Sequence, residues 1–181
     1  MLDFSKNYFE LFGLPVDYIV DADHLSTHYR ELQKAVHPDR FANSTEQERR
    51  ISMQGAVHIN EAYETLKDPV RRARYLLDLK GVDMGNGQET TRDTLFLMEQ
   101  MELRETLEEA PNKPDPYAVI ADFMADIQQR IDVLVDEMAV QFKGSTPEQL
   151  EAAKENLLKM QFLKKLGNDA ESLEAELDDA L

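Results

Sequence analysis

The sequence contains no cysteine among its 181 residues. Without thiols the chain cannot form disulfides, ligate zinc or an iron–sulfur cluster through sulfur, or use a cysteine nucleophile. Glycine and proline are also sparse, with seven of each, whereas 42% of the residues are hydrophobic and 31% are charged. This composition is typical of a folded chain that buries a core rather than of a disordered one.

Long apolar segments are missing as well. No stretch reaches the roughly 18 consecutive apolar residues of a membrane-spanning helix, and the first residues lack the basic and then apolar pattern of a signal peptide. We therefore expect a cytoplasmic protein with no signal peptide and no membrane as a partner.

Basic residues are scarce in the second half of the chain. Residues 1–80 hold 11 Lys or Arg and 13 Asp or Glu, a net charge of −2, whereas residues 81–181 hold 9 and 23, a net charge of −14. This asymmetry indicates two modules with different partners. Nucleic acid is not an expected partner, because binding to phosphates requires clustered Lys and Arg.

Apolar residues recur with helical spacing, and no alternation typical of a strand extends over four residues. The expected fold class is all-α. In the first half we expect a helix over residues 21–37, ended by Pro38, and a second helix from Ser44 or Thr45 to about 68. Glu48 is placed to complete a capping box, and a basic helix should follow over about 70–80. The first two helices should pack as an antiparallel hairpin with a polar loop at its tip.

The second half predicts an antiparallel three-helix bundle. Helices are expected over about residues 91–110, 115–143 and 147–167, followed by a polar, acidic tail helix to Leu181. The glycine-rich segment 81–87 is the best domain boundary. We therefore expect domains at 1–80 and 91–181 joined by a linker at 81–90. The middle helix has the most regular apolar stripe: Ile120, Phe123, Ile127, Ile131, Leu134, Met138 and Phe142.

The tripeptide His37-Pro38-Asp39 lies in the polar loop of the first hairpin. Alone it is a weak signal, because any tripeptide recurs by chance about once in ~8,000 positions. Its context is more specific. It follows an amphipathic helix that carries Tyr29, Arg30 and Lys34, and it precedes a helix that ends in Ile59–Leu66, a proline and the basic segment Arg71–Arg74.

These features together resemble helices II, III and IV of a J-domain. Asn7–Pro15 and Arg92–Gln100 extend the resemblance over almost the whole chain to the HscB family, the J-proteins of iron–sulfur cluster assembly. General J-proteins instead carry Gly/Phe-rich linkers or cysteine-rich zinc modules after the J-domain. The cysteine module of eukaryotic relatives is absent too, which implies a bacterial-type member.

The resemblance implies a co-chaperone and not an enzyme. Such a protein stimulates the ATPase of the DnaK-type chaperone HscA and delivers the iron–sulfur scaffold IscU to it. Pro38 would stiffen the turn, and Asp39 would offer a carboxylate to a partner's Arg or Lys. Arg40 stands where HscB proteins often have Lys. The chaperone-binding residues that the resemblance implies are His37, Pro38, Asp39, Tyr29, Arg30, Lys34 and Arg40.

The helix expected over 91–110 is apolar on two faces. Phe96, Leu103 and Leu107 share one side, whereas Leu97 and Met98 lie on the other. The second face is either buried against neighbouring helices or exposed to a partner, and its flanking glutamates favour a docking patch. The scaffold-binding residues that the resemblance implies are Leu97, Met98, Met101, Glu102, Glu105 and Phe162.

Other functions stay open at this point. The chain could be a general J-protein for unfolded clients, or an acidic adaptor that is not a chaperone. No cofactor, catalytic group or metal is expected, since His24 and His28 stand one turn apart without a third ligand. The segment Arg71–Arg74 is interpreted as a solvated or salt-bridged helix face.

Overall fold

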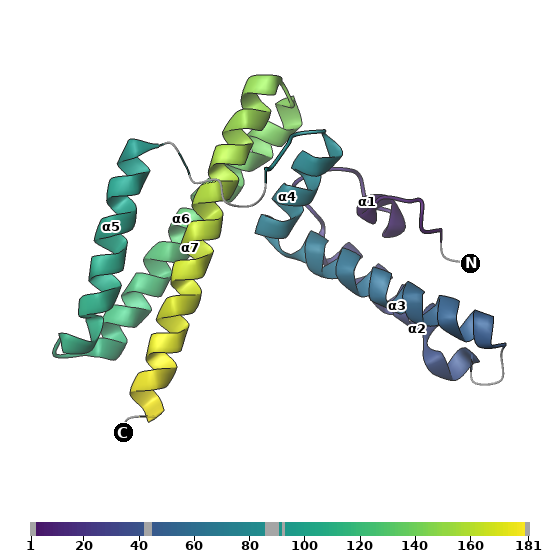
Figure 1. The fold of residues 1–181 in the computed structure, drawn as a ribbon, viewed down its shortest axis with the longest axis horizontal. Coiled ribbons are helices and arrows are strands. Elements are labelled where there is room, and N and C mark those ends of the chain that lie inside the picture. The colour runs from purple at the N-terminus through teal and green to yellow at the C-terminus, as the bar shows by residue number, and fades with distance from the viewer. Residues whose placement is uncertain (1–2, 42–44, 86–90, 92, 180–181) are drawn as a thin grey trace. The chain divides into compact units, whose positions relative to one another are not determined.

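The computed structural model describes residues 3–41, 45–85, 91 and 93–179, and every regular element in those ranges is a helix (Figure 1). The all-α fold class is therefore confirmed. The chain divides into two compact units, Met1–Lys80 and Gly81–Leu181. In the part of the chain that the structure describes, no helix has both the length and the apolar character needed to cross a membrane.

The first unit is built on the hairpin of α2 (Ala22–Val36) and α3 (Glu46–Lys67). The predicted caps are confirmed. Asp21 accepts a hydrogen bond from the His24 amide, and Thr45 forms a capping box with Glu48. The loop of the hairpin contains a short 3-10 helix, η1 (Pro38–Phe41), that the sequence did not predict.

Two shorter helices close the base of this hairpin, α1 (Tyr8–Leu11) and α4 (Pro69–Leu79). Tyr8 and Tyr75 stack with their ring centroids 4.4 Å apart, and the Tyr8 amide donates to the Tyr75 hydroxyl. Helix α1 was not predicted from the sequence. The core contains the fully buried side chains Phe9, Phe12, Tyr18, Ile59, Leu66, Leu76 and Leu77.

Arg72 of the basic segment has a structural role. Its guanidinium lies 5.1 Å from the centroid of the Tyr18 ring and donates to the carbonyl of Leu66 near the end of α3. Burial lowers the pKa of Arg72 and raises the pKa of Tyr18 to about 12. Arg71 and Arg74 are exposed, so the interpretation of this segment as a solvated face holds for two of its three cations.

The second unit contains α5 (Thr94–Glu109), η2 (Ala110–Asn112), α6 (Pro116–Gly144) and α7 (Pro147–Asp179). The long helices α6 and α7 pack against each other, and α5 lies beside them (Figure 1). All residues of the predicted α6 stripe are buried except Ile131, which is half-buried. The buried residues of α7 are Ala153, Asn156, Leu157, Met160, Leu163, Leu166 and Ala170.

The prediction that a helix ends at Gly167 is wrong, because α7 continues without a break to Asp179. Glycine inside a helix costs about 1 kcal/mol relative to alanine, but Leu166 and Ala170, on either side of Gly167, are buried, and the packing of α7 on α6 keeps the helix intact. A Cβ built on Gly167 would lie 3.7 Å from Ile127 of α6. The last turns are also attached to α6, since the Tyr117 hydroxyl donates to the carboxylate of Asp178 at 2.9 Å.

Candidate functional site

The tripeptide His37-Pro38-Asp39 forms the turn at the end of α2. His37 is extended, as a residue before proline should be, and its carbonyl accepts from the Arg40 amide at 3.0 Å. The Asp39 amide donates to Nδ1 of His37 at 3.3 Å. The His37 and Asp39 side chains are 57% and 90% exposed, so both are available to a partner.

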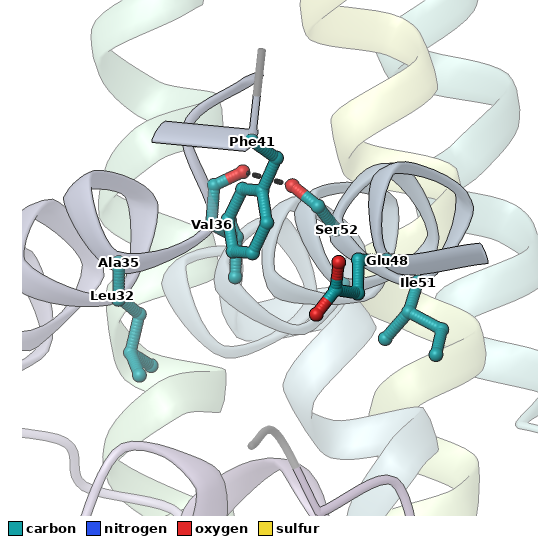
Figure 2. Close-up of a pocket in the computed structure, with 8 residues that line it drawn as sticks. Leu32, Ala35, Val36, Phe41, Glu48, Ile51 and Ser52 are labelled. Atoms are coloured by element: carbon teal, nitrogen blue, oxygen red, sulfur yellow. Dashed lines mark hydrogen bonds between the residues drawn. The ribbon is translucent and has the colours of Figure 1, made fainter. Parts of the chain in front are cut away.

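A buried hydrogen bond anchors this turn to α3. The Ser52 hydroxyl donates to the carbonyl of Val36 at 2.6 Å, as Figure 2 shows. Val36 is the last residue of α2, and its carbonyl has no partner within the helix. The bond lies beside a pocket of about 440 Å³ that is lined by Leu32, Ala35, Val36, Phe41, Glu48, Ile51, Ser52 and Gly55.

Ser52→Ala is therefore expected to destabilise the hairpin by about 1–3 kcal/mol, because it leaves a buried carbonyl without a partner. Chemical denaturation of the two proteins measures this difference. Ser172→Ala is the matched control, since Ser172 makes the same kind of bond to the carbonyl of Asn168 at an exposed position. Equal stability of the Ser52 variant and the wild type would contradict the anchoring role.

Three cations lie near the turn. Arg30 and Lys34 are exposed on the face of α2 opposite to Leu32, and the Arg30 guanidinium contacts Ser26 one turn earlier. The guanidinium of Arg40 lies 3.5 Å from the carbonyl of Lys34. We call Arg30, Lys34 and Arg40 the cation row.

Tyr29 connects the two helices of the hairpin. Its ring stacks on Tyr63 at 4.0 Å, and its hydroxyl donates to the side chain of Asn60 at 2.9 Å. The side chain is half-buried. Tyr29 was predicted from the sequence to bind the chaperone, and these contacts, which hold α2 against α3, were not predicted.

The second face of α5 is exposed. Met98 and Met101 are 59% and 72% exposed, and Leu97 is 40% exposed, while Phe96 on the first face is buried. Leu95 is 78% exposed and extends this surface by almost a turn. We call Leu95, Leu97, Met98 and Met101 the α5 patch. Leu95 was not predicted as part of this surface, although its position three residues before Met98 places the two on the same side of the helix.

Polar contacts fix the start of α5 against α7. The Asp93 carboxylate caps α5 by accepting from the amides of Leu95 and Phe96, and it also accepts from Lys159 of α7 at 2.6 Å. The hydrogen bond from Lys159 and those from the capped amides hold the pKa of Asp93 below its ordinary value. On the other side, Arg130 of α6 pairs with Glu99. The α5 patch is therefore presented on a helix held at two places.

Phe162 of α7 contributes both to the packing of the unit and to its accessible surface. It is half-buried, and its ring meets Phe96 edge to face at 5.9 Å. The guanidinium of Arg104 lies 5.2 Å from the ring centroid. Phe162 therefore packs α5 on α7 while keeping part of its surface accessible. Glu102 and Glu105, which follow the α5 patch along the helix, are exposed.

The histidine pair noted in the sequence does not form a larger cluster. His24 and His28 stack at 4.1 Å, and Nε2 of His24 lies 3.3 Å from the carbonyl of Phe12. Within the described ranges there is no group of three or more side chains of the kinds that hold a metal ion.

Comparisons with known proteins find one family match in each of the two units. The family described as the DnaJ domain matches residues 7–75, and the family described as the HSCB C-terminal oligomerisation domain matches residues 92–171. The co-chaperone protein HscB homolog of Shewanella amazonensis is 42% identical over 176 residues, which cover 96% of this chain and 99% of the relative.

Two solved structures resemble this one closely. Chaperone HscB from Vibrio cholerae has a TM-score of 0.84 at 42% identity, covering 95% of this chain and 99% of that one. The human co-chaperone protein HscB has a TM-score of 0.85 at 28% identity, covering 95% of this chain and 84% of that one. The first unit matches the DnaJ domain, the second unit matches the HSCB C-terminal domain, and the HscB relatives match almost the whole chain. The chain therefore belongs to the HscB family of J-domain co-chaperones.

Proposed function

We propose that this protein stimulates ATP hydrolysis by a DnaK-type chaperone of the HscA kind and delivers the iron–sulfur scaffold IscU to it. The observation that carries the proposal is the His37-Pro38-Asp39 turn, with the His37 and Asp39 side chains exposed and Ser52 anchoring the end of α2, in a chain of the HscB family. The proposed setting is the cytoplasm, in line with the bacterial relatives. Membranes and nucleic acids are not among the proposed partners.

The turn suits a role in selecting one conformation of the chaperone. The exposed Asp39 carboxylate can accept hydrogen bonds from an Arg or Lys of the chaperone, and η1 fixes its position before contact. A partner surface that binds the hydrolysis-competent conformation more tightly shifts the chaperone toward that state. The ATP chemistry then belongs to the chaperone, and this chain acts without being an enzyme.

The α5 patch suits a protein cargo. Its apolar side chains are followed along α5 by the exposed carboxylates of Glu102 and Glu105, which gives an apolar centre with an acidic rim. A complementary cargo would present apolar side chains next to basic ones. We assign this role to IscU on the family relationship, with Phe162 at the edge of the contact.

Steady-state ATPase assays test the proposed function. HscA alone, with this protein, and with this protein plus IscU should show increasing rates, and DnaK should respond less than HscA. A general J-protein would stimulate DnaK as strongly and without dependence on IscU. A protein that only bridges partners would leave both ATPase rates unchanged, which would contradict the proposal.

Association with the chaperone is expected to slow as salt rises from about 20 to about 150 mM, because the exposed cation row would steer the encounter through long-range attraction. Stopped-flow measurements should show a smaller change in the dissociation rate. Lys34→Gln combined with Arg40→Gln should flatten the salt dependence, whereas Arg71→Gln, which removes an exposed cation of α4, should not. A wild-type association rate that does not change with salt concentration would refute electrostatic steering by the cation row.

A further inference from the structure

Methionine is the only sulfur-containing residue in this chain, which has eight methionines and no cysteine. The described methionines fall into two groups. Met84, Met138 and Met160 are at most 7% exposed and Met124 is half-buried, whereas Met53, Met98 and Met101 are 65%, 59% and 72% exposed. Two of the three exposed thioethers therefore lie one turn apart within the α5 patch.

An exposed thioether reacts with a hydroperoxide by oxygen transfer. The sulfur lone pair attacks one peroxide oxygen and the O–O bond breaks as the S–O bond forms. After a proton shift the other oxygen leaves as water from hydrogen peroxide, or as an alcohol from an alkyl hydroperoxide. The sulfur loses two electrons and the peroxide gains them. In many proteins thiolates compete for the oxidant, but this chain has none.

We propose that Met98 and Met101 form an oxidation site at which hydroperoxide switches off docking of the scaffold. The inference rests on the proposed function of the α5 patch. Hydrogen peroxide suits the site because it is uncharged at neutral pH. Anionic oxidants are repelled by Glu102, Glu105 and the net charge of −14 on residues 81–181.

Oxidation changes the chemistry of the patch rather than its position. A sulfoxide oxygen is a strong hydrogen-bond acceptor, and an apolar contact that covers it leaves it without a partner. Each sulfoxide should weaken docking by about tenfold or more. The helix should survive, because Phe96, Leu103 and Leu107 on its buried face are not oxidised.

Leucine variants separate oxidation from simple loss of contact. Met98→Leu with Met101→Leu keeps the apolar volume of the patch and removes both reactive sulfurs. Met53→Leu is the matched control, because Met53 is as exposed as the α5 pair but lies on α3 of the other unit. The double leucine variant is compared with its own untreated sample, and its affinity for the scaffold should be the same before and after peroxide, whereas Met53→Leu should lose affinity as the wild type does.

The test treats the full-length protein with hydrogen peroxide, removes the oxidant with catalase, maps the oxygen added to each peptide by mass spectrometry and titrates IscU. We expect Met53, Met98 and Met101 to be oxidised before Met138 and Met160. Affinity for IscU should fall at least about tenfold with an unchanged circular dichroism spectrum, and methionine sulfoxide reductase should restore it.

Several results would overturn the proposal. These are oxidation of Met98 and Met101 no faster than that of the buried methionines, full-strength binding by the oxidised protein, or an equal loss in the double leucine variant. If untreated protein does not bind IscU at all, the proposed function of the patch fails and the switch fails with it. Binding before treatment that persists afterwards refutes the switch alone.

Discussion

His37→Gln should abolish stimulation of the chaperone's ATPase while the protein stays folded. The His37 side chain is 57% exposed and contacts Asp39 in the same turn, so its loss should remove little packing. Exposed substitutions of this kind change stability by about 0.5 kcal/mol or less. Steady-state ATPase rates and thermal melting by circular dichroism measure the two effects on the same samples.

The matched control for this variant is Val57→Gln. Val57 is 67% exposed on α3 of the same unit and is not among the residues assigned to the chaperone. It should keep full stimulation. A His37 variant that melts well below the wild type would show that the residue is structural, and one that stimulates normally would remove the turn from the mechanism.

Leu97→Ala with Met98→Ala should weaken binding of the scaffold on the order of 100-fold. Burying a large apolar side chain is worth about 1.5–3 kcal/mol, so truncating two of them at an interface removes several kcal/mol. Both side chains are substantially exposed in the free protein, so its melting temperature should change little. Isothermal titration with IscU measures the affinity.

Val140→Ala is the control for the double variant, because Val140 is 67% exposed on α6 of the same unit. Phe162 is left out of the double variant because Phe162→Ala would also remove the packing on Phe96 and lower the melting temperature. A folded double variant that binds at full strength would refute the α5 patch as the docking surface. An unfolded one would show that these side chains support the core.

Local chemistry explains which parts of the fold the sequence predicts. Asp21 and the pair Thr45 and Glu48 mark helix starts correctly, because a cap depends on residues within one turn. Gly167 misleads for the opposite reason, since its low helix propensity is a local property, whereas α7 is held by packing against α6, which precedes it in the chain. The 3-10 helix η1 was also not predicted, because Pro38 indicates that α2 ends but not which structure follows it.

The same contrast between local and long-range effects applies to the proposed docking residues. Helical spacing places Leu97, Met98 and Met101 opposite the buried face. Whether that face is exposed depends on which helices lie nearby, so the spacing alone cannot predict it. Tyr29 shows the converse problem. Its contacts with Asn60 and Tyr63 join residues more than 30 positions apart, and no local pattern reports them.

On the proposed function, one chain must carry both the J-domain turn and the α5 patch to deliver the scaffold. The most direct test measures transfer of fluorescently labelled IscU to HscA in the presence of ATP. We predict efficient transfer with the wild type and none with His37→Gln or with the double variant of Leu97 and Met98. An equimolar mixture of the two defective variants should also fail, because neither chain can bind cargo and engage the chaperone together. Transfer restored by the mixture would contradict the claim.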